Sequence, residues 1–275
     1  MRYIFVALVL GLGALMAIPM VLMITGSFMG SEETSGAASR LVPHHPTLEA
    51  YSEIFKFPIV RWFLNSAFIA IVKTCLTLIA GLSVAYGISR YQFRGKTLVF
   101  AAIAAAILVP GYTSTVPSYI ITRGIGLYNT LWALIIPGIF DAAAVWFLAK
   151  FIKSIPDSLF DTAKMDGAGP FRTLISVVLP MSLPALAALG CIRIVGAWSD
   201  FLGPLIYLRK ESLMTMPVGV QQVIFFKVIE NMVTHTSLSR IDLAGAVLTT
   251  IPGAILFFVS QRYFVNGMFA KTGGK

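Results

Sequence analysis

Long runs without a charged residue constrain the fold of this chain more than any other feature of its sequence. Four such runs contain no Asp, Glu, Lys or Arg, over residues 3–31, 74–89, 97–122 and 243–261. A transmembrane helix needs about 20 consecutive apolar residues, and a chain in lipid must satisfy its backbone hydrogen bonds internally. The runs therefore predict an all-α polytopic membrane protein rather than a soluble domain.

Composition and two weaker runs complete the expected topology. Hydrophobic residues make up 57% of the chain and charged residues 12%, against roughly half and a quarter in soluble domains. Residues 124–149 and 173–208 are apolar apart from one and two charges, respectively. The first run is long and lacks a small-residue cleavage site before Glu32, so we expect an uncleaved anchor. We predict one membrane domain over residues 1–275, with spans near 3–27, 64–88, 98–121, 131–152, 182–207 and 242–262.

The net charge of +9 could suggest a nucleic-acid-binding protein, but the distribution of the bases argues against it. Lysines and arginines lie at the ends of the apolar runs instead of gathering in one face or one run. With the N-terminus inside, the inner segments carry the larger share, including Arg90, Arg94 and Arg262. This bias favours cytoplasmic positions for both termini, and we expect no nucleic acid as a partner.

The connection between the fourth and fifth spans, residues 153–181, is the longest segment that this topology leaves in the cytoplasm. Its pattern predicts an elbow of two short helices hinged at Gly167, where a side chain would resist a left-handed turn. Ser154 can cap the first helix. Periodicity alone leaves open whether lipid or a protein covers the elbow. The apolar faces at helical spacing are Leu159, Phe160 and Ala163 on the first helix, and Phe171, Leu174, Ile175 and Val178 on the second.

The elbow also carries a motif. The stretch IPDSLFDTAKMDGAGPFRTLISVVLP, residues 155–180, resembles the cytoplasmic signature loop of permease subunits of bacterial ABC importers. In the carbohydrate branch this loop reads I-P-x-x-L-x-E-A-A-x-x-D-G-A and ends in L-P. The chain departs from it by an aspartate for the glutamate and a threonine for the first alanine. The resemblance implies that an ATPase is coupled through Leu159, Phe160, Asp161, Thr162, Ala163, Asp166, Gly167 and Ala168.

Other stretches extend the resemblance over nearly the whole chain. HPTLEAYSEIF with RWFLNSAFIA is similar to the first outer loop and second span of these permeases. GAWSDFLGPLIYL resembles their W-N-x-F-x-x-P stretch, with Ser199 in place of the usual asparagine. SQRYFVNGMFAKTGGK is similar to their C-terminal ending. The chain is identified as a member of the maltose-type second permease family.

The resemblance implies a set of partners in a bacterial inner membrane. These are a second, non-identical permease, two ATPase subunits, an extracytoplasmic solute-binding protein, membrane lipid and a sugar as substrate. ATP and Mg²⁺ belong to the ATPase subunits, so this chain itself is expected to bind no cofactor and to catalyse no reaction. We expect a groove of the ATPase to bury the face of Leu159, Phe160 and Ala163. RGKT, residues 94–97, is only the end of a phosphate-binding loop, because Arg90 stands where that loop requires glycine.

Charged residues inside the spans mark candidate sites, because they are costly in a membrane. Lys73, Asp141, Arg193 and Asp200 lie there, although any one of them can simply pair with another charge. Sugars are bound by polar groups with aromatic rings against their C–H faces. The candidates for the solute path are Asn65, Asp141, Trp198 and Asp200.

Two other classes of function compete. An ion-coupled secondary transporter would also carry intramembrane charges, but usually shows an internal repeat, and we find no convincing duplication. An intramembrane hydrolase needs a nucleophile beside a base, and His44, His45 and His235 all lie outside the predicted spans. The scattered histidines, and Cys75 and Cys191 within spans, predict neither a metal site nor a disulfide.

Overall fold

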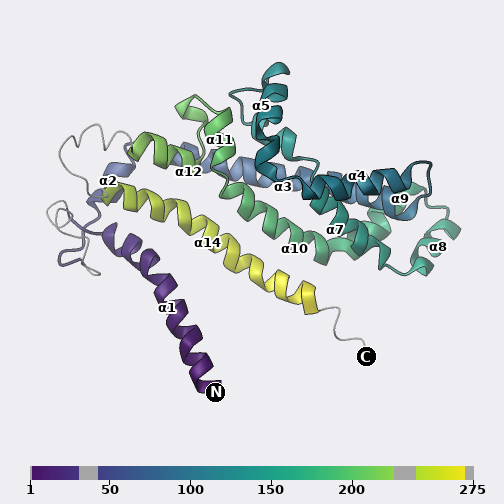
Figure 1. The fold of residues 1–275 in the computed structure, drawn as a ribbon, viewed down its shortest axis with the longest axis horizontal. Coiled ribbons are helices and arrows are strands. Elements are labelled where there is room, and N and C mark those ends of the chain that lie inside the picture. Colours follow the sequence, from purple (N-terminus) through teal and green to yellow (C-terminus); the bar gives the residue numbers. More distant parts are fainter. Residues whose placement is uncertain (1, 31–42, 226–239, 270–275) are drawn as a thin grey trace. The chain divides into compact units, whose positions relative to one another are not determined.

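The computed structural model of the chain describes residues 2–30, 43–225 and 240–269 (Figure 1). All regular secondary structure in these residues is helical, so the predicted all-α class is confirmed. Among them, the long helices are α1 (Arg2–Gly26), α3 (Ile59–Arg90), α10 (Leu179–Trp198) and α14 (Arg240–Phe269). The shorter helices are α2 (Glu49–Ile54), α4 (Lys96–Leu108), α5 (Thr115–Gly124), α6 (Trp132–Ile135), α7 (Ala142–Lys153), α8 (Asp157–Met165), α9 (Pro170–Thr173), α11 (Leu202–Tyr207) and α12 (Met216–Gly219). Short 3₁₀ turns are η2 (Gly111–Ser114), η3 (Ile136–Gly138) and η5 (Glu211–Leu213), and π turns are η4 (Leu174–Val178) and η6 (Val220–Phe225).

Four segments of the described chain are long and apolar enough to cross a membrane unbroken. These segments are Arg2–Gly26, Ile59–Arg90, Pro170–Trp198 and Arg240–Val259, and they match the first, second, fifth and sixth predicted spans. The third and fourth predicted spans are each a pair of helices bent at a short break. The number of spans reaches six when each bent pair is taken as one, so the multi-pass architecture is confirmed and the shape of two spans is corrected.

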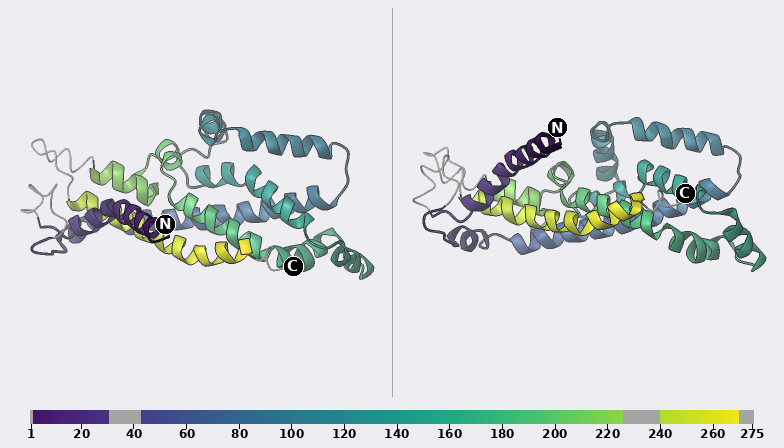
Figure 2. Two further views of the ribbon diagram at one scale, coloured as in Figure 1. Left: turned by 60° about the horizontal axis from the view of Figure 1, so that its bottom comes forward. Right: turned by 90° about the horizontal axis from the view of Figure 1, so that it is seen from below.

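The third span, predicted as one helix over 98–121, consists of two helices that meet at an angle of 100°. α4 ends at Leu108, and η2 and α5 then run almost perpendicular to it (Figure 2). Pro110 explains the break, because its ring disfavours helical backbone at the preceding residue and its nitrogen has no hydrogen to donate. Val109 is extended accordingly, with φ −76° and ψ 119°.

The fourth span bends by 43° between the segments Trp132–Gly138 and Ala142–Lys153. The carboxylate of Asp141 starts the second segment, because its Oδ1 accepts the backbone N–H of Ala144 at 2.9 Å. An aspartate at this position satisfies one of the amides that a helix N-terminus leaves without a partner. Asp141 therefore has a structural role as the N-cap of α7, which its position in an apolar run did not indicate.

The fifth span differs from its predicted bounds, 182–207, at both ends. The helix already begins at Pro170, so the second helix of the elbow is the first part of the span rather than a separate element. The π turn η4 precedes Pro180, whose ring and missing N–H disturb regular α-helical bonding. At the other end the helix stops at Trp198, and α11 follows after Oδ1 of Asp200 accepts the N–H of Gly203 at 3.1 Å.

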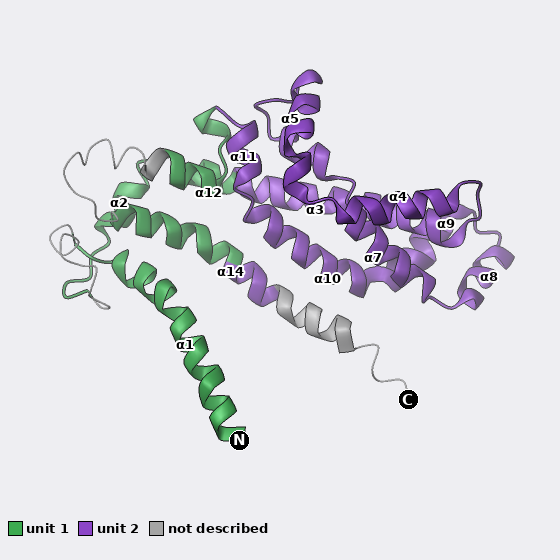
Figure 3. Ribbon diagram, viewed as in Figure 1, with its two compact units in different colours: residues 1–64, 210–253 green, residues 65–209, 254–275 purple. Residues whose placement is uncertain are grey.

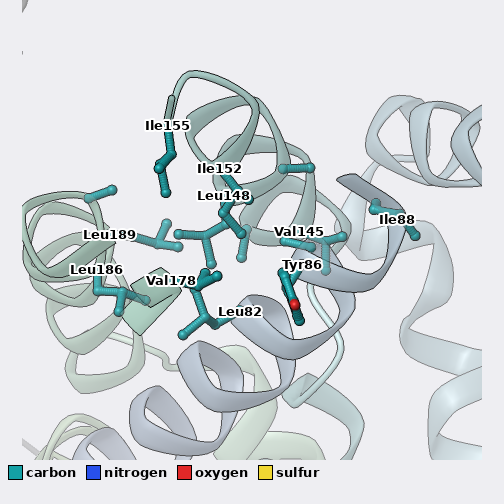
Figure 4. Close-up of a cluster of buried hydrophobic side chains, with 14 of the residues drawn as sticks. Leu82, Tyr86, Ile88, Val145, Leu148, Ile152, Ile155, Val178, Leu186 and Leu189 are labelled. Carbon is teal, nitrogen blue, oxygen red and sulfur yellow. The ribbon is translucent and has the colours of Figure 1, made fainter. Parts of the chain in front are cut away.

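The chain forms two compact units, residues 1–64 with 210–253 and residues 65–209 with 254–275 (Figure 3). In the second unit, one cluster of buried side chains joins α3, α7, η4 and α10 (Figure 4). Its larger members are Leu82, Tyr86, Ile88, Val145, Leu148, Ile152, Ile155, Val178, Leu186 and Leu189, with Phe160 of α8 added. Lipid is as apolar as these side chains, so close packing rather than removal from water holds this core together within the membrane.

In the first unit, charged and aromatic contacts hold α2 and the helix ends around it. The guanidinium of Arg240 pairs with Glu49 and, at 3.0 Å, with Glu53 of α2. The ring of Trp62 is fully buried, and its Nε1 donates to the carbonyl of Glu211 at 2.9 Å. Gly219 lies so close to this ring that a Cβ there would collide with it. A glycine is therefore required at this position by packing, not by backbone conformation.

Candidate functional site

The first elbow helix, α8, ends in a turn that requires glycine. The N–H of Gly167 donates to the carbonyl of Lys164 at 3.0 Å, and the N–H of Ala168 donates to that of Ala163 at 2.9 Å. These two bonds form a Schellman motif, in which the residue after the helix is left-handed. Gly167 has φ +70°, which glycine adopts without steric cost. The predicted chain reversal at Gly167 is confirmed.

The start of α8 differs from the prediction. The helix begins at Asp157 with Pro156 at the N-cap position, and no side chain caps it. Ser154, predicted as the cap, instead ends α7 and donates its hydroxyl to the carbonyl of Phe151 at 2.7 Å. The cause is Pro156, because proline disfavours helical backbone at the residue before it. Asp157 places a negative charge at the positive end of the helix dipole.

One face of α8 is covered by the chain itself. Phe160 and Ala163 are only 6% and 9% exposed, and Phe160 belongs to the core cluster of the second unit. Leu159, in contrast, is 38% exposed. The expectation that a partner's groove buries all three residues is therefore corrected. Phe160 and Ala163 fix the elbow to its own unit, and Leu159 remains accessible.

The opposite face of α8 is exposed and mostly polar. Asp161, Thr162, Asp166 and Gly167 are exposed, and Ala168 is half-buried. The ammonium of Lys164 lies 3.5 Å from Oδ1 of Asp161, but both side chains are solvated, so this ion pair contributes little stability. A large apolar side chain, Met165, is 81% exposed among these polar groups. Sequence reasoning missed it, because the signature motif leaves its position unspecified.

Sequence reasoning also missed Arg90, the last residue of α3, which reaches the elbow. Its Nη2 donates to the carbonyls of Ile152 at 2.7 Å and Ile155 at 2.5 Å. Its Nη1 pairs with the carboxylate of Asp157, and its guanidinium carbon lies 3.8 Å from the centre of the Phe160 ring. Basic residues commonly flank the cytoplasmic ends of membrane spans, so an arginine at this position of the sequence did not indicate a further role.

A second candidate site is a cavity of about 780 Å³ within the second unit, at the bends of the third and fourth spans. Irregular backbone is tolerated in a membrane domain where it lines such a cavity. The polar lining consists of Lys73, Ser114, Thr115, Ser118, Asp141 and Asp200, and the aromatic lining of Tyr112, Phe140 and Tyr207. Hydroxyls, carboxylates and an ammonium beside aromatic rings can hydrogen-bond a polar solute and contact its apolar faces.

The cavity brings together two of the four predicted path residues. Asp141 and Asp200 line it, whereas Asn65 and Trp198 do not. Trp198 is 4% exposed, on a buried face of α10. Asn65 lies eight residues before Lys73 along α3, about 12 Å at the helical rise.

Asp141 is occupied by contacts within the chain. Oδ2 of Asp141 lies 2.7 Å from Nη1 of Arg193, and Oδ1 caps α7. The simpler interpretation of Arg193, that it pairs with a carboxylate, is therefore confirmed. Removing one partner would leave a charge without its counterion in a half-buried place, so the pair is best understood as a link between α7 and α10.

Lys73 differs from the other charges of the cavity. Asp141 and Asp200 each accept a backbone N–H, and Asp141 also pairs with Arg193, whereas the ion pairs and side-chain hydrogen bonds described for the chain do not include the ammonium of Lys73. Its aliphatic chain lies against Gly138, where an added Cβ would collide with Cε, and Thr77 donates to the carbonyl of Gly138 at 3.0 Å. The close approach at Gly138 thus gives the ammonium its place at the cavity wall.

The remaining reactive side chains form no site in the described part of the chain. Cys75 and Cys191 are free thiols. Within the described ranges, no three His, Cys, Asp or Glu side chains are grouped so that they could hold a metal ion. His235 lies outside those ranges.

Comparisons with known proteins agree with the helical membrane architecture. The permease protein AraQ of an arabinooligosaccharides transport system from Halalkalibacterium halodurans is 30% identical over 91% of this chain and 88% of its own. The inner membrane ABC transporter permease protein YcjP of Escherichia coli is 28% identical over 92% and 89%. A chain from the crystal structure of a bacterial ABC transporter for import of the acidic polysaccharide alginate shares the fold, with a TM-score of 0.82, 23% identity and 96% coverage of both chains. The family model of the binding-protein-dependent transport system inner membrane component matches residues 2–270, and the chain therefore belongs to that family of multi-pass inner membrane proteins.

Proposed function

We propose that this chain is one of two non-identical permease subunits of an ATP-driven importer, and that it lines half of the path for a sugar or sugar-like solute. Membership of the family makes the chain a permease subunit rather than an enzyme. The names of the relatives, including AraQ, support a carbohydrate. No comparison supports the ion-coupled secondary transporter.

The observation that carries the proposal is the elbow. It holds the signature-loop residues on a helix whose inner face is fixed in the core and whose outer face is exposed. We infer that a cytoplasmic ATPase contacts the exposed coupling residues Leu159, Asp161, Thr162, Asp166 and Gly167, with the half-buried Ala168 at the edge. Phe160 and Ala163 then act from inside, by making α8 move with its unit.

ATP and Mg²⁺ are proposed to bind to two ATPase subunits outside this chain. Closure of those subunits would push on the elbow, and the permease would respond as a packed body, because interfaces and cores switch between discrete arrangements. Both termini are proposed to lie in the cytoplasm, on the side of the elbow. This orientation follows from the bias of lysine and arginine toward the inner segments.

The cavity is the proposed part of the solute path. Lys73, Asp200 and the hydroxyls of Ser114, Thr115 and Ser118 offer hydrogen-bonding groups, and tyrosine rings lie beside them. An extracytoplasmic binding protein would deliver the solute from outside. We place Asp141 at the wall of the path as a structural residue, and we leave Asn65 and Trp198 outside the cavity.

Reconstitution tests the proposal. The purified chain should form a stable complex only with a second permease and two ATPase subunits, and uptake into vesicles should need ATP and the binding protein. A homodimer of this chain that transports with ATPase and binding protein alone would contradict the paired assembly. Uptake that continues in cells depleted of ATP but holding their ion gradients would contradict the energy source.

A further inference from the structure

We propose that Arg90 is a positioning residue that joins the elbow to the second span, so that motion imposed on α8 reaches α3. This inference rests on the proposed contact between the elbow and an ATPase. The side chain meets three consecutive features of the chain, which are the end of α7, the link before α8 and the first turns of α8.

The carbonyl contacts are the first part of this joint. The last carbonyls of a helix lack partners within the helix and carry the negative end of its dipole. Ile152 lies in the last turn of α7, and Ile155 lies in the link that follows. A single Nη2 of Arg90 donates to both carbonyls. The bend between α7 and α8 is thereby tied to the end of α3.

The stacked ring is the second part of the joint. Phe160 is buried, and the guanidinium carbon of Arg90 lies over its ring, 3.8 Å from the ring centre. Such a contact is stronger where water is excluded, and the side chain of Arg90 is only 16% exposed. Because Phe160 faces inward on α8, displacement of that helix displaces the ring and the guanidinium together.

The ion pair with Asp157 is the minor part. The side chain of Asp157 is 85% exposed, so solvent screens its attraction to Arg90. The joint therefore depends on the planar fork of the guanidinium, which donates in two directions while stacking on a ring. Lysine carries the same charge but cannot reproduce this geometry.

Arg90→Lys in the complete transporter tests the joint, with Arg94→Lys as the matched control. Arg94 is an exposed arginine four residues after Arg90, in the turn before α4, and the ion pairs and side-chain hydrogen bonds described for the chain do not include it. The measurement is the number of ATP molecules hydrolysed for each solute imported into vesicles. We expect Arg90→Lys to raise this ratio about fivefold or more, the lower range of typical coupling between sites, and Arg94→Lys to leave it unchanged.

A merely structural role would lower the amount of assembled transporter, and hydrolysis and import would fall together at a constant ratio. That result overturns the inference, as does an unchanged ratio in Arg90→Lys that still co-purifies with the ATPase. Phe160→Leu keeps an apolar side chain and removes the ring, and we expect a smaller rise in the ratio. If Arg90→Lys raises the ratio but Phe160→Leu leaves it unchanged, the contact between the guanidinium and the ring is not part of the joint. Failure of the wild-type chain to bind any ATPase would instead reject the proposed function.

Discussion

The left-handed turn at Gly167 allows the cost of a single side chain to be worked out from geometry. An L-residue in this conformation costs about 1–2 kcal/mol, and more when it is β-branched. A Cβ at Gly167 would meet no atom within 4 Å, so no steric collision adds to this cost. Gly167→Ala should therefore destabilise the end of α8 by backbone strain alone, and Gly167→Val by a larger amount.

Gly169 provides the matched control two residues later. It also has open space around its Cβ position, but its backbone is at φ −69° and ψ 171°, which any residue adopts. Gly169→Ala should be neutral or stabilise by about 0.4–1 kcal/mol, because it restricts the unfolded chain. The two alanine variants thus share the same side-chain change and open space for the added Cβ, and they differ in the backbone conformation at the substituted residue.

Hydrogen exchange at the amides of residues 167 and 168 measures the local effect, since both donate in the Schellman motif. A loss of 1–2 kcal/mol should speed their exchange by roughly 5- to 30-fold in Gly167→Ala and leave Gly169→Ala unchanged. Equal exchange in the two variants would refute the strain argument. Co-purification and uptake address the partner: Gly167→Val should lose most ATPase attachment and most import, while membrane insertion and pairing with the sister permease persist. Normal attachment and import would show that the elbow is only a connection.

Three further predictions concern the membrane domain and its orientation. Arg193→Gln should destabilise the purified protein by about 1.5–3 kcal/mol, because it leaves the carboxylate of Asp141 without its counterion. Adding Asp141→Asn should recover part of this loss, since it removes the unpaired charge and asparagine still caps α7. If the two losses in stability simply add in thermal unfolding, the two side chains are not paired. Gly138→Ala should displace the side chain of Lys73 and reduce import, whereas Gly111→Ala should leave import unchanged, because a Cβ at Gly111 meets no atom within 4 Å. Equal uptake rates in the two variants would show that transport does not need the close approach of Lys73 to Gly138. In a variant without Cys75 and Cys191, Ser158→Cys should resist an impermeant thiol reagent on spheroplasts and Ser35→Cys should react, and the reverse pattern would invert the topology.

The long helices were predictable because apolar length alone decides them. Residues 3–27 and 64–88 were expected as spans, and α1 and α3 cover them with small differences at the ends. The elbow glycine was predictable for a different reason. A helix that reverses direction needs a left-handed residue after it, and Gly167 was the residue that could take this conformation without strain.

The breaks within the third and fourth spans were missed although their causes are visible in the sequence. Pro110 lies inside one apolar run and Asp141 inside another, and hydropathy summed over a run registers neither a lost backbone amide nor a carboxylate that starts a new helix. The apolar pattern on α8 was misassigned for the opposite reason. Spacing identifies which side chains share a face, but the chain's own core, which covers Phe160, comes from residues distant in sequence.

Arg90 could not be found by any motif, because its main partners are backbone carbonyls that every residue possesses.

The charges of the membrane domain differ in how far contacts within the chain already occupy them. Asp141 gives one oxygen to a helix N-terminus and the other to Arg193, and Asp200 gives an oxygen to the start of α11. A carboxylate so engaged shapes the bends that create the cavity, but has less capacity left for a solute. Lys73 takes part in no described ion pair and faces the cavity from the continuous helix α3. An ammonium is costly in a membrane unless it has a task, so transport should depend on Lys73 more than on either aspartate's charge.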